Sequence, residues 1–209
     1  MMFDMRIFIV ALEKFKALIE EKNSFLTDLD AAIGDADHGI NMKRGAARVV
    51  EKISGKDYAD CGELFRDVAM TIMSVVGGSG GPLYGTFFMK VAQKLGTATE
   101  VSTEELADAM TEGLAGVMSL GKSSVGDKTM VDTLTPALEA LRKNAAQGGE
   151  AAWNSAVSAA ERGMESTVSL VSRRGRSSYL GERSVGHQDP GATSSFYLIS
   201  SFRDAFLNK

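Results

Sequence analysis

Three aspartates, one histidine and one asparagine lie within residues 30–41, together with two glycines. The aspartates are Asp30, Asp35 and Asp37, and their intervals of five and two residues do not place them on one helical face. A loop or a helix start must therefore bring them together. Carboxylates this close repel one another unless a cation lies between them. Oxygen ligands favour Mg²⁺, Mn²⁺ or Ca²⁺ over zinc, so the stretch predicts a site for a hard divalent cation.

Two other interpretations of this acidic stretch compete with the metal site. An EF-hand loop that began at Asp35 would need a glutamate at position 46, which is Ala46, and this excludes it. A connection that merely caps a helix stays open, because aspartate and asparagine stabilise turns and helix starts. The rest of the chain favours the metal site over the cap.

The bulk composition limits the class of protein. The chain has 209 residues, a formal net charge of −4 and 44% hydrophobic residues, which predicts a single domain over residues 1–209 with a substantial core. The acidic excess argues against nucleic-acid binding. The one cysteine, Cys61, excludes an internal disulfide, and we expect it to be buried. Neither a signal-peptide pattern nor a run of about 18 apolar residues occurs, so we expect a cytoplasmic protein without a membrane span.

Apolar residues recur at helical spacing through most of the chain, and strand signals are absent, so we predict an all-α fold. Ser102 and Glu105 form a capping-box pattern, Pro136 predicts a kink or split, and Trp153 is expected in the core. The eight expected helices lie at about 4–22, 40–53, 60–76, 82–95, 102–120, 129–145, 150–172 and 190–207.

The connections between these helices alternate in character. Those after the first, third, fifth and seventh helices are long, rich in glycine and polar, whereas those between them are short. Alternate loops lie at the same end of an up-and-down helical bundle or barrel. We therefore expect one end of the molecule to carry the functional site.

The glycine run from Gly77 to Gly81 precedes an expected helix start at Pro82. Glycines let backbone N–H groups approach an anion, and the helix N-terminus adds a favourable dipole. No Gly-Lys-Ser/Thr follows, so this is not a Walker A motif. The run predicts a phosphate cradle, although a glycine run alone is also an ordinary helix break.

Other polar residues fall in the same group of loops. Both histidines of the chain, His38 and His187, lie there. Gly121 and Met130 could face an adenine ring, although core packing suits Met130 equally well. Cations that could add positive charge for phosphates, or simply be solvated, are Lys122, Lys128, Arg176 and Arg183. A carboxylate-bound Mg²⁺ beside a phosphate cradle implies a nucleotide and phosphoryl transfer, with the aspartates as metal ligands and not as proton-transfer bases.

Four longer motifs, 34–41, 81–88, 126–130 and 178–193, closely resemble the nucleotide-binding L subunits of bacterial dihydroxyacetone kinases. The similarity extends over nearly the whole chain. It implies an eight-helix antiparallel barrel with ADP, or ATP once phosphorylated, and two Mg²⁺ at one end. It implies that the catalytic metals are held by Asp30, Asp35 and Asp37. The residues that it implies around the nucleotide are His38, Asn41, Met42, Gly78, Ser79, Gly80, Gly121, Met130, Arg176, Asp189, Pro190 and Gly191.

The resemblance also implies partners. A separate K subunit binds dihydroxyacetone covalently through its own histidine, and the L subunit supplies the phosphoryl group. In the phosphotransferase-system type, which we favour, a phosphohistidine M subunit rephosphorylates resident ADP; in the other type ATP exchanges freely. We expect a homodimer. A nucleotide-sensing module that docks on a partner such as a transcription regulator, and a metal-dependent phosphoester hydrolase, are the alternatives.

The glycine run departs from the pattern expected of this family, which is Gly-Gly-Ala-Ser-Gly. Here the run reads Gly-Gly-Ser-Gly-Gly, with the serine at Ser79. A serine hydroxyl near the phosphates is therefore shifted by one position or lost.

Overall fold

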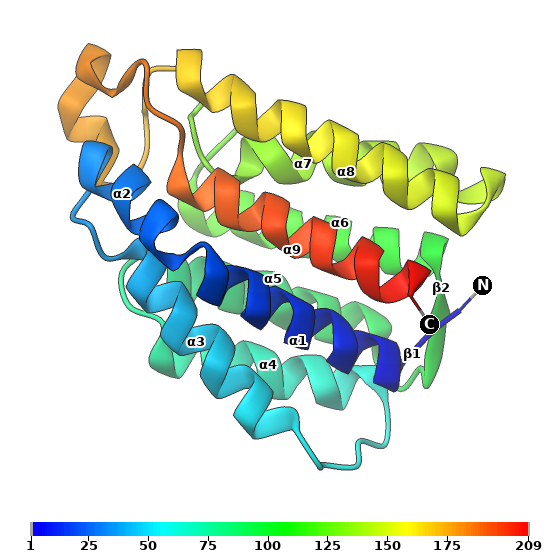
Figure 1. The fold of residues 1–209 in the computed structure, drawn as a ribbon. Coiled ribbons are helices and arrows are strands. Elements are labelled where there is room, and N and C mark those ends of the chain that lie inside the picture. The colour runs from blue at the N-terminus through cyan, green and yellow to red at the C-terminus, as the bar shows by residue number, and fades with distance from the viewer. Residues whose placement is uncertain (1, 209) are drawn as a thin grey trace.

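The computed structural model describes residues 2–208. Its eight long helices form a closed antiparallel ring in which each packs against the next, and the first packs against the last (Figure 1). They are α1 (Met5–Glu21), α3 (His38–Ile53), α4 (Cys61–Val75), α5 (Gly80–Leu95), α6 (Thr103–Gly121), α7 (Met130–Asn144), α8 (Gly149–Ser166) and α9 (Pro190–Leu207). The predicted all-α class is confirmed. No helix within residues 2–208 is both long and apolar enough to cross a membrane.

The short helix α2 (Asn23–Ile33) was not predicted. We expected the first helix to end near residue 22 and a loop to follow, but only Lys22 interrupts the helical path. Leu26, Asp30 and Ile33 are the buried residues of α2, at helical spacing. The acidic composition of this stretch concealed that spacing. Asp30 consequently lies in the last turn of a helix.

Two short strands also contradict the expectation of a strand-free chain. β1 (Met2–Asp4) pairs antiparallel with β2 (Glu100–Ser102), and Phe3 lies opposite Val101. Three residues are too few to show an alternating pattern, so the sequence carried no signal for them. The pair lies beside both chain ends, at the end of the ring away from α2 (Figure 1).

Aromatic side chains fill much of the core inside the ring. The Phe8 and Phe65 rings meet edge to face at 4.9 Å, and the Phe65 and Phe88 rings stack at 5.9 Å, which joins α1, α4 and α5. Trp153 is fully buried, as predicted, and so is Cys61. Burial raises the pKa of the Cys61 thiol to about 11, which makes it unreactive at neutral pH.

Of the two outcomes expected at Pro136, the split does not occur, because α7 is continuous from Met130 to Asn144. A proline leaves the carbonyl four residues earlier, here that of Asp132, without its helical partner. Gly163 of α8 packs directly on this point: a Cβ there would lie 2.2 Å from the Asp132 carbonyl oxygen. The absence of a side chain at Gly163 thus allows α7 and α8 to approach closely.

Several helix boundaries differ from the prediction. α5 begins at Gly80 instead of position 82, and α8 ends at Ser166, where the 3₁₀ turn η2 (Thr167–Ser169) follows. The long segment before α9 contains a further 3₁₀ element, η3 (Arg176–Ser184), and a third, η1 (Ala145–Gln147), follows α7. The capping box of α6 is present as predicted, since Ser102 and Glu105 each bond the other's backbone N–H.

Candidate active site

A cavity of about 850 Å³ opens at one end of the ring. This volume lies within the range of small-molecule sites, roughly 300–1,000 Å³. Residues from all four glycine-rich connections line it: 30–41, 76–84, 117–130 and 173–191. The prediction that alternate loops converge at one end is therefore confirmed.

The three aspartates of the acidic stretch come together on one side of this cavity. Each of Asp30, Asp35 and Asp37 offers a carboxylate oxygen, and these oxygens lie within 4.8 Å of one another. Asp30 comes from the end of α2, while Asp35 and Asp37 lie in the connection to α3. This connection is bent sharply at Ala36, whose φ of 61° is unfavourable for a residue with a side chain. The strained turn is thus located between two of the three carboxylates.

Asp30 also stabilises the start of α3. Its Oδ2 accepts hydrogen bonds from the backbone N–H groups of Asp37 (2.8 Å) and His38 (3.1 Å). A Cβ at Gly34 would lie 2.1 Å from Asp30 Oδ1, so only glycine leaves room for this carboxylate. The helix-cap interpretation and the metal interpretation of the acidic stretch are therefore compatible, because one oxygen of Asp30 caps and the other remains for a ligand.

This donor set fits a divalent cation. The three carboxylates offer oxygen atoms only, and their mutual repulsion at this separation falls when a hard cation binds. In the described residues the acidic turn faces the glycine loop, since a Cβ at Gly78 would lie 4.0 Å from Asp37 Oδ1. A metal held by Asp30, Asp35 and Asp37 would therefore lie beside any anion held by the glycines.

Arg176 reaches across the cavity mouth to the acidic turn. Its Nε lies 2.9 Å from Asp35 Oδ2. The side chains are 70% and 37% exposed, so the pair contributes little stability, at most about 1 kcal/mol. Arg176 thus joins the η3 segment to the carboxylates through an exposed ion pair.

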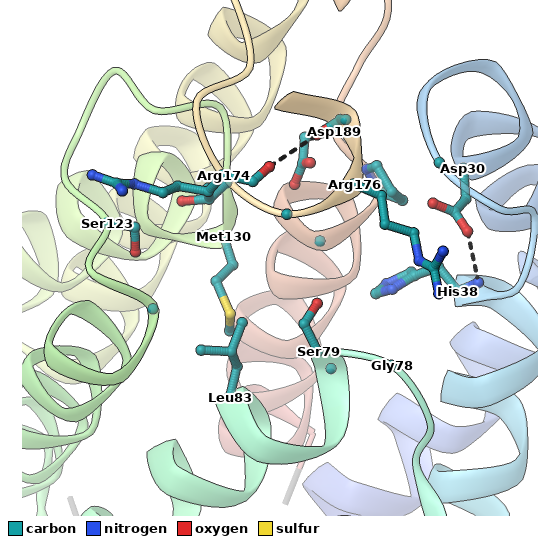
Figure 2. Close-up of a pocket in the computed structure, with 18 of the residues that line it drawn as sticks. Asp30, His38, Gly78, Ser79, Leu83, Ser123, Met130, Arg174, Arg176 and Asp189 are labelled. Atoms are coloured by element: carbon teal, nitrogen blue, oxygen red, sulfur yellow. Dashed lines mark hydrogen bonds between the residues drawn. The ribbon is translucent and has the colours of Figure 1, made fainter. Parts of the chain in front are cut away.

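The glycine loop has the conformation expected of an anion cradle. Gly78 has a φ of 62°, and a Cβ at Gly81 would lie 2.3 Å from the Val76 carbonyl oxygen. Ser79 is the N-cap of α5 but makes no side-chain cap bond, and its hydroxyl points into the cavity (Figure 2). The first N–H groups of α5 have no partner within the helix, which suits an anion.

The opposite side of the cavity is apolar. Met130 of α7 and Leu83 of α5 lie next to each other there, away from Asp30 and His38 (Figure 2). A Cβ at Gly121 would be in contact with Leu83 at 3.4 Å and with the Ser123 hydroxyl at 3.2 Å, so this glycine makes the wall flat. The cavity thus offers an apolar wall at one side and charged groups at the other.

A chain of hydrogen-bonded hydroxyl groups holds the His38 ring in position. Its Nε2 lies 2.9 Å from Ser194 Oγ, which lies 2.7 Å from the Tyr84 hydroxyl. Burial lowers the pKa of His38, although the nearby carboxylates of Asp30 and Asp37 oppose this. The imidazole is therefore fixed in position by residues of α5 and α9.

Asp189 caps the N-terminus of α9 at the cavity wall. Its carboxylate accepts the Ala192 N–H at 2.6 Å, and the side chain is buried. Burial raises the pKa of Asp189 to about 7, although the Ala192 N–H and the ammonium group of Lys128 counteract it. The carboxyl group therefore titrates near neutral pH.

This raised pKa makes folding pH-dependent. Between pH 4 and pH 7 the folded state keeps the Asp189 proton that the unfolded state has lost, so the free energy of unfolding falls as pH rises through that window. Asp189→Asn keeps an oxygen for the α9 cap but cannot ionise. From pH 5 to pH 8, we expect the free energy of unfolding of the variant to rise by about 2–3 kcal/mol relative to that of the wild type, as measured by urea unfolding. Parallel pH profiles for the two proteins would contradict the assignment.

A family model described as the DAK2 domain matches residues 32–204. The chain belongs to the DAK2 domain family. It is 45% identical over 184 residues to the PEP-dependent dihydroxyacetone kinase ADP-binding subunit DhaL of Escherichia coli K12, covering 87% of this chain and 88% of that protein. It is 37% identical to the PTS-dependent dihydroxyacetone kinase ADP-binding subunit DhaL of Lactococcus lactis, covering 91% and 92%.

The DAK2 fold is also found in a solved structure. A crystal structure of the dihydroxyacetone kinase from C. freundii in complex with AMP-PNP and Mg²⁺ matches with a TM-score of 0.74 and 27% identity. The match covers 93% of this chain but 33% of that one, so the DAK2 domain described here spans about a third of the longer protein.

The cavity of this DAK2 domain is lined by every predicted nucleotide or metal residue except Met42. Met42 is 4% exposed and belongs to the hydrophobic core, because it lies on the face of α3 that turns toward the ring interior. The predicted residues that do line the cavity are Asp30, Asp35, Asp37, His38, Asn41, Gly78, Ser79, Gly80, Gly121, Met130, Arg176, Asp189, Pro190 and Gly191.

The cations of the DAK2 domain differ from one another more than the sequence suggested. Two of the expected cations, Lys122 and Arg183, are exposed and do not line the cavity, and neither does the exposed His187. Lys128 borders the cavity, but it is buried and donates to backbone carbonyls. Sequence reasoning also missed part of the lining. The clearest omissions are Leu83, Tyr84, Ser123 and Arg174. Arg174 carried a signal, since it lies two residues from Arg176 in the same polar segment.

Proposed function

We propose that the chain is the nucleotide-binding subunit of a dihydroxyacetone kinase and transfers the γ-phosphoryl group of a Mg²⁺-bound nucleotide to dihydroxyacetone on a separate K subunit. The observation that carries this proposal is the close approach of the carboxylate cluster to the glycine loop, with 4.0 Å between Asp37 Oδ1 and the Cβ position of Gly78. The family and the named relatives support the choice of substrate.

Different residues of the cavity bind the metal and the phosphates. Asp30, Asp35 and Asp37 hold Mg²⁺, which when bound neutralises charge on the phosphate oxygens. The backbone N–H groups at the start of α5 and the Ser79 hydroxyl bind phosphate oxygens beside this cluster. Ser79 lines the cavity, which supports a phosphate-binding hydroxyl at the shifted position.

The remaining residues orient the nucleotide. Met130 and Leu83 offer an apolar surface for a base, at a side of the cavity away from Asp30 (Figure 2). Arg176, which pairs with Asp35, is placed to contact phosphate as well. His38 is held rigidly by Ser194 and presents its ring beside the acidic turn. This arrangement fixes the phosphates between a cation site and a helix start, which is the positioning that phosphoryl transfer needs.

The phosphoryl donor is proposed to be a phosphohistidine M subunit that rephosphorylates resident ADP. The relatives that match along 88–92% of their own length are named PEP-dependent or PTS-dependent. Relatives named erythrulose kinases match along only 29–34% of theirs. The alternative is an exchangeable ATP. A homodimer belongs to the same proposal, together with the single domain over residues 1–209 and the cytoplasmic location that the sequence itself predicts.

Reconstitution tests the kinase assignment against the two other functions. The purified chain is mixed with a dihydroxyacetone-loaded K subunit and the phosphohistidine donors, and dihydroxyacetone phosphate is measured over time. We expect turnover that depends on every component and on Mg²⁺. A nucleotide sensor would give no turnover under these conditions, and a phosphoesterase would release inorganic phosphate without the K subunit.

A further inference from the structure

Lys128 is the only lysine or arginine that is buried within residues 2–208, with 1% of its surface exposed. It lies in the loop before α7, and its ammonium group donates hydrogen bonds to the backbone carbonyls of Thr167 and His187. No step of the proposed phosphoryl transfer uses it. The expected role of a solvated cation that attracts phosphate does not fit its burial.

The position of Lys128 is costly in two ways. Its φ of 63° is unfavourable for a residue with a side chain. Removing an ammonium group from water carries a further penalty, and burial accordingly lowers the pKa of Lys128, although the carboxylates of Asp189 and Asp132 oppose this. A leucine or methionine would fill the same space without the desolvation cost, so a chain that keeps a lysine here gains something from this contact pair.

The two acceptors mark both ends of one segment. Thr167 directly follows α8, and His187 lies two residues before the α9 cap Asp189. Thr167 and Asp189 are also joined directly, because Thr167 Oγ1 accepts the Asp189 N–H at 3.0 Å. The chain between them includes η3 and carries Arg174 and Arg176, which line the cavity. The ammonium group therefore links the two ends of this segment, in addition to the bond between Thr167 and Asp189.

The same loop contacts the segment a second time. Asp127 accepts a hydrogen bond from Arg174 Nε at 3.0 Å, and the Asp127 carbonyl accepts the Arg173 N–H at 3.1 Å. Burial opposes ionisation of Asp127, but the Ser124 N–H and the Arg174 guanidinium outweigh it and lower the pKa of that carboxyl. The loop before α7 thus holds the segment both at its base and near its middle.

We propose that Lys128 is a positioning residue that holds segment 167–189 in place, so that the arginines of this segment and the start of α9 are aligned with the cavity before the ligand arrives. The ligand's identity as a nucleotide rests on the proposed function, but the ordering of the segment does not. Binding to a pre-ordered segment avoids the entropic cost of ordering it, so Lys128, which borders the cavity, acts on affinity through this segment.

Lys128→Met tests this role, and Lys122→Met is the matched control. Lys122 is also a lysine with positive φ (48°) in the same connection, but it is exposed. Without nucleotide, we expect hydrogen exchange in 167–189 and trypsin cleavage after Arg173, Arg174 and Arg176 to accelerate at least about tenfold in Lys128→Met, since two hydrogen bonds to a charged group are lost. ADP affinity should fall at least about tenfold, and Mn²⁺ affinity of the aspartates should not fall. Lys122→Met should leave all of these unchanged.

Two results would overturn the proposal. One is hydrogen exchange in Lys128→Met that rises equally in α4 and in 167–189, which indicates a general loss of stability. The other is hydrogen exchange in 167–189 that stays at the wild-type rate. If Lys128→Met does not fold, reductive methylation of the lysines in the wild-type protein tests the proposal instead. Lys128 should be modified far more slowly than Lys122, at the rate at which segment 167–189 opens, and equal rates would refute the role. Weak ADP binding with an ordered segment would instead count against the proposed function.

Discussion

Asp35→Asn is expected to abolish phosphoryl transfer in the reconstituted kinase while the helices fold normally. Asp35 contributes one of three oxygens that lie within 4.8 Å of one another. Its carboxylate is exposed and pairs with Arg176, not with a backbone group, so its charge can be removed without disturbing a helix. Metal binding supplies several kcal/mol of charge stabilisation, so activity should fall about 10³-fold.

The matched control for this variant is Asp28→Asn. Asp28 is an exposed aspartate of α2 that precedes Asp30 by two residues and does not line the cavity. Both variants should keep the wild-type circular dichroism, and only Asp35→Asn should lose Mn²⁺ binding in titrations without nucleotide. Asp30→Asn is less informative, because Asp30 also caps α3. Wild-type turnover by Asp35→Asn would remove the metal cluster from the mechanism.

Gly81→Ala should damage both the fold and the nucleotide site. The new Cβ would lie 2.3 Å from the Val76 carbonyl oxygen, which is backbone and cannot rotate away. The start of α5 must therefore move away from Val76, and the loop that holds Gly78 and Ser79 must move with it. We expect a loss of about 1–3 kcal/mol in the free energy of unfolding and at least about a tenfold loss in ADP affinity.

Gly80→Ala is the control for the unfolding measurement. It adds the same methyl group one residue earlier in the same helix turn, but its nearest contact is the Val76 Cγ1 at 3.4 Å. Its free energy of unfolding should stay within about 0.5 kcal/mol of wild type in urea denaturation. If the two variants unfold at the same urea concentration, the close approach of Gly81 to Val76 does not shape the loop.

The parts of the fold that follow from periodic patterns were accessible from the sequence. The eight long helices show apolar residues at helical spacing, and the alternation of simple and glycine-rich connections predicted a single functional end. The helix α2 was not predicted because only Leu26, Asp30 and Ile33 mark its buried face, in a stretch that is dominated by acidic residues. The strands were not predicted because pairing of three residues depends on contacts 96 or more positions apart, between 2–4 and 100–102.

The side-chain partners in the site were not accessible from the sequence. Spacing showed that the aspartates must converge, but not that Asp30 would use one oxygen to cap α3. Lys128 and Lys122 look alike in the sequence, yet one is buried and the other exposed, because the Lys128 acceptors lie 39 and 59 residues further along the chain. Met42 was placed at the nucleotide by resemblance, and only the packing of α3 directs it into the core.

The most direct test of the nucleotide assignment is to denature the purified protein and identify what it releases. After extensive dialysis, we predict one equivalent of ADP per chain, held as a resident cofactor that the M subunit rephosphorylates. A protein that releases no nucleotide on denaturation but binds ATP reversibly would contradict the proposal of a phosphohistidine donor and would make ATP a substrate. A protein that neither retains nor binds adenine nucleotide in the presence of Mg²⁺ would contradict the kinase assignment itself.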